Sequence, residues 1–348
     1  MALPILPAGE SFFCARPWTG FEVENDGTVK PCCMAKSGCG NINNDSIADI
    51  WNGPAYQEFR RKMAAGEWQD TCRSDCPRLH GDFDDAKPSP EMPAFAANYE
   101  TNEAEIESRA IVLESQPRFW KLTHSTLCNI DCVMCYQDRQ DKEVLPERFY
   151  GEMLELYGYI QEIEILGGEP FAIRRLRDFL GSFPADRFPD TKFSFVTNGS
   201  IHDSRTTDLV RNLNVSWMSI SLDAATAPTY ARIRRGGDFA VTLDGARKWI
   251  SLGREQGFSV VLAFTVMRDN VTELPLFTEL ACEQNVDCLF GWVQGTKGDQ
   301  HLIDEELLSQ SIDLTKAVIA SATREMPMAT LTLESISARL RAGVRARV

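Results

Sequence analysis

The sequence is short of positive charge and of long apolar runs, and each shortage excludes a class of protein. Its 348 residues carry 36 Lys and Arg against 50 Asp and Glu, so the formal net charge is −14 at pH 7. Such a chain repels a phosphate backbone, so we expect no nucleic-acid partner. No apolar run approaches the length that spans a bilayer, so we expect no membrane partner. The opening MALPILPAGESFFC resembles no signal peptide, and a cytoplasmic location is expected.

Cysteine, by contrast, is abundant, with eleven residues. In a reducing compartment this number favours metal binding over disulfides. The cysteines form two groups in different sequence contexts, which indicates two metal sites. The first group is Cys14, Cys32, Cys33, Cys39, Cys72 and Cys76, the second is Cys128, Cys132 and Cys135, and Cys282 and Cys288 stand apart.

The alternation of strand and helix patterns predicts an α/β fold. Six candidate strands alternate with amphipathic helices, and strands in such a series pair in parallel because each needs a helical crossover to return. Six units are fewer than the eight of a closed barrel, so we expect an open, partial (β/α)6 barrel. The predicted strands are 119–123, 162–166, 192–197, 216–222, 259–266 and 287–293.

The rest of the chain divides around this barrel. Residues 1–80 read as a small cysteine-rich module with a hairpin turning at Asp26-Gly27 and two helices, the first capped by Ser46. Residues 81–116 form an acidic, Pro-containing linker that is expected to be helical near 102–110. The barrel takes 117–323, and 324–348 read as a helical extension.

Cys128, Cys132 and Cys135 form a C-x3-C-x2-C pattern on the loop after the first predicted strand of the barrel. Three thiolates can hold three irons of a 4Fe–4S cluster and leave the fourth iron open for a substrate or cofactor. Two alternatives remain for this pattern. One is a zinc site with His124 as the fourth ligand, and the other is a set of three buried structural thiols.

With the motifs that follow it, the triad resembles the radical S-adenosylmethionine (SAM) superfamily over residues 118–295. Gly167-Gly168-Glu169-Pro170, after the second strand, resembles the GGE motif of that family. Thr197-Asn198-Gly199 and Ser221-Leu222-Asp223, at the ends of the next two strands, resemble its TNG and ribose motifs. TYARIRRGGDF is similar to a Y-x-x-I-R-x-G-G-x-F stretch of peptide- and sugar-modifying members.

The resemblance implies a role for each of these motifs in binding SAM. Glu169 would accept from the ammonium group, and Ser221 and Asp223 would bind the ribose hydroxyls. Arg234 would pair with the carboxylate, with Arg235 as the fallback. Further contacts are implied for Gly167, Gly168, Asn198, Met134, Tyr136 and Asn270.

One position departs from the family pattern. The family usually has an aromatic residue just before the third cysteine, where the chain contacts the adenine, and this chain has Met134 there, followed by Tyr136. A methionine can also pack on a purine, so SAM binding is still expected, and the departure concerns the adenine contacts alone.

The N-terminal module resembles the twitch/SPASM fold, which binds an auxiliary iron–sulfur cluster. The resemblance rests on C-x12-G-x4-C, on a later C-x3-C, and on the phrases DGTVKPCC and GNINNDSIADIWNGPAY. It implies a second 4Fe–4S cluster held by Cys14, Cys32, Cys72 and Cys76. A zinc ribbon is the alternative. Most relatives carry this module after the barrel, so the chain resembles the twitch-first members.

The resemblance implies an enzyme that reductively cleaves SAM to a 5′-deoxyadenosyl radical. The radical would abstract hydrogen from a peptide or a sugar-like small molecule, with net oxidation or bond formation assisted by the auxiliary cluster. An external donor of the flavodoxin or ferredoxin type would supply electrons. The alternatives are a radical epimerase with a cysteine hydrogen donor, and a non-catalytic iron–sulfur or zinc protein.

Overall fold

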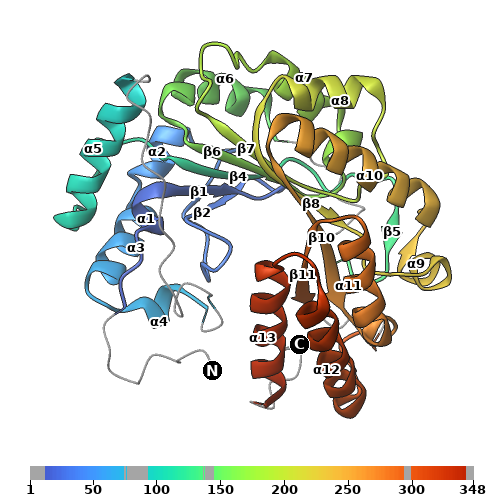
Figure 1. Ribbon diagram of the computed structural model, residues 1–348. Coiled ribbons are helices and arrows are strands. Elements are labelled where there is room, and N and C mark those ends of the chain that lie inside the picture. The colour runs from blue at the N-terminus through green and yellow to red at the C-terminus, as the bar shows by residue number, and fades with distance from the viewer. Residues whose placement is uncertain are drawn as a thin grey trace.

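A continuous nine-stranded sheet runs through the computed structural model, in the order β11-β10-β8-β7-β6-β4-β1-β2-β3 (Figure 1). Its first six strands in that order pair in parallel, so the predicted partial (β/α)6 barrel is confirmed. These strands are β4 (Phe119–Thr123), β6 (Glu162–Leu166), β7 (Lys192–Thr197), β8 (Asn214–Ser221), β10 (Ser259–Val266) and β11 (Asp287–Trp292). The structure describes residues 12–73, 76, 93–135, 137, 145–293 and 299–341.

Helices cover one face of the parallel strands, because alternate strand residues on that face are apolar. Phe149 packs against Trp120, with ring centroids 6.2 Å apart, and Phe171 packs against Phe195 at 5.5 Å. In Figure 1 these helices run from above the sheet to its right-hand side. They are α6 (Glu147–Leu156), α7 (Arg174–Ser182), α8 (Ser204–Arg211), α10 (Phe239–Gln256) and α11 (Leu274–Glu283), with 3-10 turns η2 (Tyr157–Tyr159), η3 (Pro170–Ala172) and η4 (Val271–Glu273).

The N-terminal module contains the expected hairpin and capped helices. Thr28 N–H donates to the Asp26 carboxylate at 2.9 Å, and Gly27 takes the left-handed conformation that the turn requires, at φ 83°. The Ser46 hydroxyl accepts from Asp49 N–H at the start of α2. The elements are α1 (Arg16–Thr19), β1 (Gly20–Val23), β2 (Thr28–Lys30), β3 (Gly40–Asn41), α2 (Ile47–Trp51), α3 (Pro54–Ala64) and α4 (Trp68–Thr71).

The module joins the barrel through its first strand. β1 pairs in parallel with β4, from Gly20 opposite Phe119 to Val23 opposite Leu122. On the helix-covered face, the rings of Phe21 and Trp120 lie 4.6 Å apart. One sheet and one apolar core therefore extend through both the module and the barrel.

The segment between the module and the barrel contains α5 (Pro93–Glu107), so its helix begins earlier than the expected 102–110. It packs through polar side chains, which explains why the sequence shows no apolar stripe there. Asn102 donates to the Trp18 carbonyl at 2.7 Å, and Asn98 exchanges two hydrogen bonds with the Gln116 backbone. Residues 81–92 lie outside the described part.

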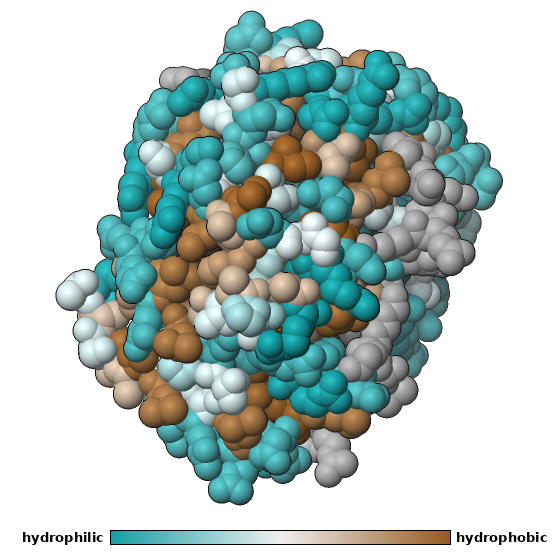
Figure 2. Space-filling view, turned by 90° about the vertical axis from the view of Figure 1, so that its right-hand side faces the viewer, coloured by the Kyte–Doolittle hydropathy of each residue, from teal (hydrophilic) through white to brown (hydrophobic). Residues whose placement is uncertain are grey.

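Two helices follow the last strand, α12 (Glu305–Ser321) and α13 (Pro327–Arg341). The helical tail was expected, whereas α12 was not. Figure 2, which views the right-hand side of Figure 1, shows apolar residues in patches between polar ones. No helix in the described ranges combines the length and apolarity that crossing a bilayer requires.

Candidate active site

The predicted motifs meet at one edge of the sheet. The triad loop follows the end of β4, and the GGE, TNG and ribose motifs follow the ends of β6, β7 and β8. Because these strands are parallel, their carboxyl ends lie at the same edge, where ligand sites of such folds gather.

The glycine pair of the GGE motif brings β6 against the triad loop. Both glycines have positive φ, 88° for Gly167 and 54° for Gly168. A Cβ on Gly168 would lie 2.0 Å from the Leu127 carbonyl oxygen, so no larger residue fits there. The next residue, Glu169, donates its N–H to that same carbonyl at 2.7 Å. The turn therefore fixes the height of the triad loop above the sheet.

The Glu169 carboxylate links β6 to β7. It is fully buried and accepts from Thr197 Oγ1 at 2.7 Å, from Asn198 N–H at 2.7 Å and from Phe171 N–H at 3.2 Å. Burial raises the pKa of Glu169, and these hydrogen bonds oppose that shift. A carboxylate offers about four acceptor positions. One therefore remains for a ligand donor.

Asn198 of the TNG motif lies beside the first cysteine of the triad. Its amide nitrogen is 3.9 Å from Cys128 Sγ and donates to Asn129 Oδ1 at 2.8 Å. Its amide oxygen accepts from Ser200 N–H at 2.9 Å. The asparagine thus connects the end of β7 to the triad loop.

A short antiparallel ribbon holds the other half of the triad loop. β5 (Asp131–Cys132) pairs with β9 (Arg234–Arg235), which follows α9 (Ala227–Ile233). Cys132 lies opposite Arg234, and Val133 N–H donates to the Ile233 carbonyl at 2.9 Å. This ribbon could not be predicted from the amino-acid pattern, because two-residue strands have no detectable period.

Arg234 forms a buried ion pair with Asp223 of the ribose motif. Its Nε and Nη2 lie 3.0 and 2.6 Å from Asp223 Oδ2, and both side chains are at least nine-tenths buried. Burial opposes the charge of Arg234, but Asp223, Cys132 and Tyr230 together more than offset it, so the pKa of Arg234 is raised. Arg235 is exposed. The guanidinium has five N–H donors, so several remain for a ligand carboxylate.

Asp223 is itself held in a left-handed backbone conformation, at φ 57°. Its Oδ1 accepts from Thr265 N–H at 2.6 Å. The buried Asn270 amide donates to the carbonyls of Asp223 and Thr265, both at 2.9 Å, and accepts from Met267 N–H at 2.8 Å. Asn270 therefore ties together the ends of β8 and β10, and its adenosyl contact stays a prediction.

A small apolar cluster lies at the ends of the last two strands. It consists of Ile233, Met267 and Val293, with Met134 packed against it. This is an apolar surface of the kind that an adenine requires. Tyr136 lies outside the described residues, and Ser221, at the end of β8, is half-buried.

The triad fits a cluster with one open iron. Burial raises the pKa of Cys132 to about 11, while Arg234 lowers it and so favours the metal-binding thiolate. Each thiolate of a cluster binds a different iron, so the sulfurs need not converge on one point. Within the described ranges, no three Cys, His, Asp or Glu side chains converge as they would on a single ion. A zinc site would need such convergence.

His124 is used elsewhere, although it precedes the triad loop. Its Nδ1 lies 2.7 Å from the Tyr150 hydroxyl, and its ring stacks on the Tyr150 ring. Burial lowers the pKa of His124 to about 3, so the ring is neutral. The side chain packs among α6 and α7 and does not take part in a zinc site with the triad.

Of the four cysteines predicted for the auxiliary cluster, Cys14 precedes α1, Cys32 follows β2, and Cys72 and Cys76 follow α4. Burial raises the pKa of Cys32 to about 12, and the charges of Cys33, Cys14 and Cys72 raise it further. The charges of Cys14 and Cys76 likewise raise the pKa of the Cys72 thiol. An isolated bridge between Ala35 and Cys72 brings the two segments together. Thiols that influence one another in this way suit a second cluster.

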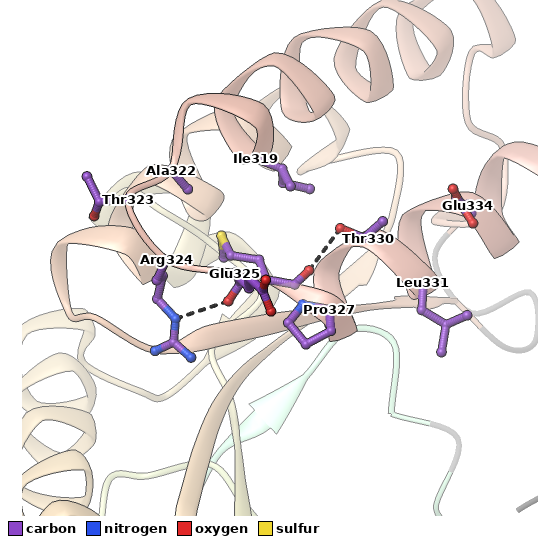
Figure 3. Close-up of a pocket in the computed structure, with 10 residues that line it drawn as sticks. Ile319, Ala322, Thr323, Arg324, Glu325, Pro327, Thr330, Leu331 and Glu334 are labelled. Atoms are coloured by element: carbon purple, nitrogen blue, oxygen red, sulfur yellow. Dashed lines mark hydrogen bonds between the residues drawn. The ribbon is translucent and has the colours of Figure 1, made fainter.

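A surface hollow lies away from these motifs. It has a volume of about 670 Å³ and is formed around the turn between α12 and α13, with Ile319, Arg324 and Leu331 on its walls (Figure 3). Met328 N–H, beside it, donates to Asp287 at the start of β11. The hollow therefore lies toward the amino end of the sheet, opposite the triad.

Comparison with known proteins agrees with this geometry. The sequence model of the radical SAM superfamily matches residues 122–276, and that of an iron–sulfur cluster-binding domain, SPASM, matches residues 14–77. Fe-coproporphyrin III synthase of Methanosarcina barkeri is 24% identical over 214 residues, which are 60% of this chain and 51% of that protein. GTP 3′,8-cyclase of Marinobacter nauticus is 27% identical over 180 residues, 49% of this chain and 52% of that protein.

The chain thus spans about half the length of the curated relatives it matches. Among solved structures, Streptococcus suis SuiB bound to precursor peptide SuiA aligns with 88% of this chain and 70% of its own, at a TM-score of 0.50 and 15% identity. That likeness shows the fold. The two domain matches imply SAM, a 4Fe–4S cluster and auxiliary iron–sulfur binding. The chain therefore carries a radical SAM domain over residues 122–276, and a SPASM domain over residues 14–77 precedes it.

Proposed function

We propose that this enzyme uses SAM bound at Cys128, Cys132 and Cys135 to abstract hydrogen from a carbon of its substrate. When bound, the reduced cluster and SAM supply a 5′-deoxyadenosyl radical. The observation that carries the proposal is the meeting of four motifs at one strand edge. At that edge the Asn198 amide nitrogen lies beside Cys128 Sγ, and Arg234 lies opposite Cys132 in the β5–β9 ribbon.

The chain's own side chains position SAM around the triad. The N–H groups of Arg234 that Asp223 leaves unused bind its carboxylate, and the free acceptor position of Glu169 binds its ammonium group. Ser221 and Asp223 take the ribose hydroxyls. The cluster around Met134 packs on the adenine.

Cys14, Cys32, Cys72 and Cys76 would hold the auxiliary cluster, which would supply an electron acceptor for net oxidation or bond formation of the substrate. The pairing of β1 with β4 supports this role, because it attaches the module directly to the first barrel strand. We propose a peptide or a small molecule as the substrate. An external flavodoxin or ferredoxin supplies the electrons for SAM cleavage.

The cysteines outside both sets bear on epimerisation, which requires a hydrogen donor at the substrate. Cys288 is fully buried at the amino end of β11, Cys282 contacts Met326, and Cys39 is buried in the module. Cys33 differs, because it is exposed and lies close enough to Lys121 for that charge to act on its thiol. We assign net oxidation to the enzyme. If it were an epimerase instead, Cys33 would be the thiol that donates hydrogen to the substrate.

The iron content of variants tests the assignment of the two clusters. Changing all three triad cysteines to Ala should reduce iron from about eight to about four per chain, because the auxiliary ligands lie in another module. The matched control is Cys282→Ala with Cys288→Ala, which should keep about eight. A triple variant that retains all its iron, or colourless zinc-containing protein from anaerobic purification, would contradict the assignment.

A further inference from the structure

A row of alternating charges crosses four strands on the face of the sheet that helices α6, α7 and α10 leave uncovered. Lys30 of β2 lies opposite Glu22 of β1, Glu22 lies opposite Lys121 of β4, and Lys121 lies opposite Glu164 of β6. We call these four residues the charge row. Two of them belong to the SPASM domain and two to the barrel.

The ion pairs within and beside the row leave one carboxylate oxygen without a hydrogen bond among the described residues. Lys30 Nζ lies 2.6 Å from Glu24 Oε1, and Lys121 Nζ lies 3.4 Å from Glu164 Oε2. Glu22 is only 6% exposed, yet its Oε2 has no hydrogen-bond partner among the residues that the structure describes. Burial raises the pKa of Glu22 to about 7, although Lys121 opposes the shift. A buried carboxylate with a free oxygen lacks a donor.

The row lies close to the triad edge and can be reached from outside. Lys121 is two residues before the end of β4, so the row lies ~7 Å below the point where the triad loop begins. The side chains of Lys121 and Glu164 are 25% and 29% exposed. A molecule of modest length can therefore touch the row with one end and present a carbon near the triad with the other.

We propose that the charge row binds the substrate, and that Glu22 accepts a hydrogen bond from an amine or guanidinium group of that substrate. Lys30 is paired with Glu24 outside the row, so Lys121 alone faces the carboxylates of Glu22 and Glu164, and this part of the row has an excess of negative charge that suits a cation. An anionic group would meet these carboxylates instead. This inference rests on the proposed function and specifies a basic group in its substrate, held jointly by the two domains.

Small cations test the row without knowledge of the substrate. The probes are n-butylammonium and n-butylguanidinium, with n-butanol and butyrate as the neutral and anionic controls, and binding to the anaerobic holoenzyme is followed by saturation-transfer NMR. The cations should bind at least about tenfold more tightly than either control, because a charge-assisted bond to Glu22 is available only to them.

Variants locate the binding. Glu22→Gln removes the charge and keeps the shape, and it should weaken cation binding about tenfold. Glu24→Gln removes the same charge two residues away and should change binding less than about twofold, because Glu24 is already paired with Lys30. Glu164→Gln removes a carboxylate of the charge row on the barrel side and should also weaken cation binding. It therefore tests the row even if Glu22→Gln fails to keep its clusters.

Equal binding of cation and butanol, tighter binding of butyrate, or full cation binding in both Glu22→Gln and Glu164→Gln would overturn the proposal. SAM cleavage is assayed separately on the same preparations. Loss of cation selectivity with SAM cleavage intact refutes the charge row alone. Absence of SAM cleavage in the wild-type holoenzyme refutes the proposed function, whatever the cations do.

Discussion

Glu169, Asp223 and Asn270 each bridge the ends of neighbouring strands through buried hydrogen bonds. Two of these residues also carry the motifs that resemble SAM ligands, so ligand binding and strand-end geometry depend on the same side chains. A carboxylate accepts on both oxygens, and an amide presents a donor in place of one of them. At these positions even an isosteric change therefore leaves a buried group unpaired.

Glu169→Gln tests this dual use. The glutamine keeps the volume but cannot accept from all of its donors, so stability should fall by about 1–3 kcal/mol. SAM affinity should fall as well, because Asn198 beside Cys128 loses its anchor. The measurements are the thermal midpoint and the SAM dissociation constant of the anaerobic protein.

Glu162→Gln is the matched control, because Glu162 is half-buried and an amide oxygen can still accept from Ser194. It should leave SAM affinity unchanged. If Glu169→Gln behaved like this control in both measurements, the carboxylate would have neither role.

At the scale of elements, the triad loop is held from two sides, by the Gly167-Gly168 turn and by the β5–β9 ribbon. The turn could be predicted, because a glycine pair after a strand indicates a backbone that approaches closely. The ribbon could not, because its partners are about a hundred residues apart in sequence and two residues long. The same holds for the pairing of β1 with β4, since nothing in either strand specifies which edge it meets.

Val133→Pro should detach the loop from the ribbon. Proline removes the N–H that donates to the Ile233 carbonyl, so Cys132 loses its fixed position opposite Arg234. We expect iron to fall from about eight to about four per chain after anaerobic desalting. Val133→Ala keeps the N–H and shortens the side chain, and it should retain about eight. Equal iron in the two variants would show that the ribbon does not support the cluster.

Sequence patterns predicted the barrel better than the connections around it. All six barrel strands could be located because each is an apolar or alternating run bounded by turns. α5 was placed too late, because Asn98 and Asn102 bury polar groups where a helix usually has an apolar stripe. The charge row could not be predicted, because its members lie in three separate segments of the chain and become neighbours only when the strands pair. The division of the chain at 80, 116 and 323 stays a prediction.

At the scale of the whole molecule, the SPASM and radical SAM domains share one sheet and one core. Phe21 and Trp120, one from each domain, pack at 4.6 Å on the helix-covered face. On the opposite face, Glu22 and Lys121 lie side by side in the charge row. The two domains are therefore expected to unfold together.

Phe21→Ala tests that coupling. It removes a buried ring at the junction, so stability should fall by about 3–5 kcal/mol. Circular dichroism should show a single transition, with SAM binding lost at the same temperature. Leu276→Ala, at a side chain that is 49% exposed on α11, should stay within about 0.5 kcal/mol of the wild type. Two separate transitions in Phe21→Ala, with SAM binding retained through the first, would show that the domains are independent.

The central claim, that the cluster at Cys128, Cys132 and Cys135 cleaves SAM, is tested most directly by 5′-deoxyadenosine. The wild-type holoenzyme, incubated anaerobically with SAM and dithionite, should form it, and the Cys128→Ala, Cys132→Ala, Cys135→Ala variant should form none. Each triad iron loses its protein ligand in that variant, while the auxiliary cysteines are unchanged. A triple variant that still forms 5′-deoxyadenosine, or a wild-type enzyme with both clusters that forms none, would contradict the account.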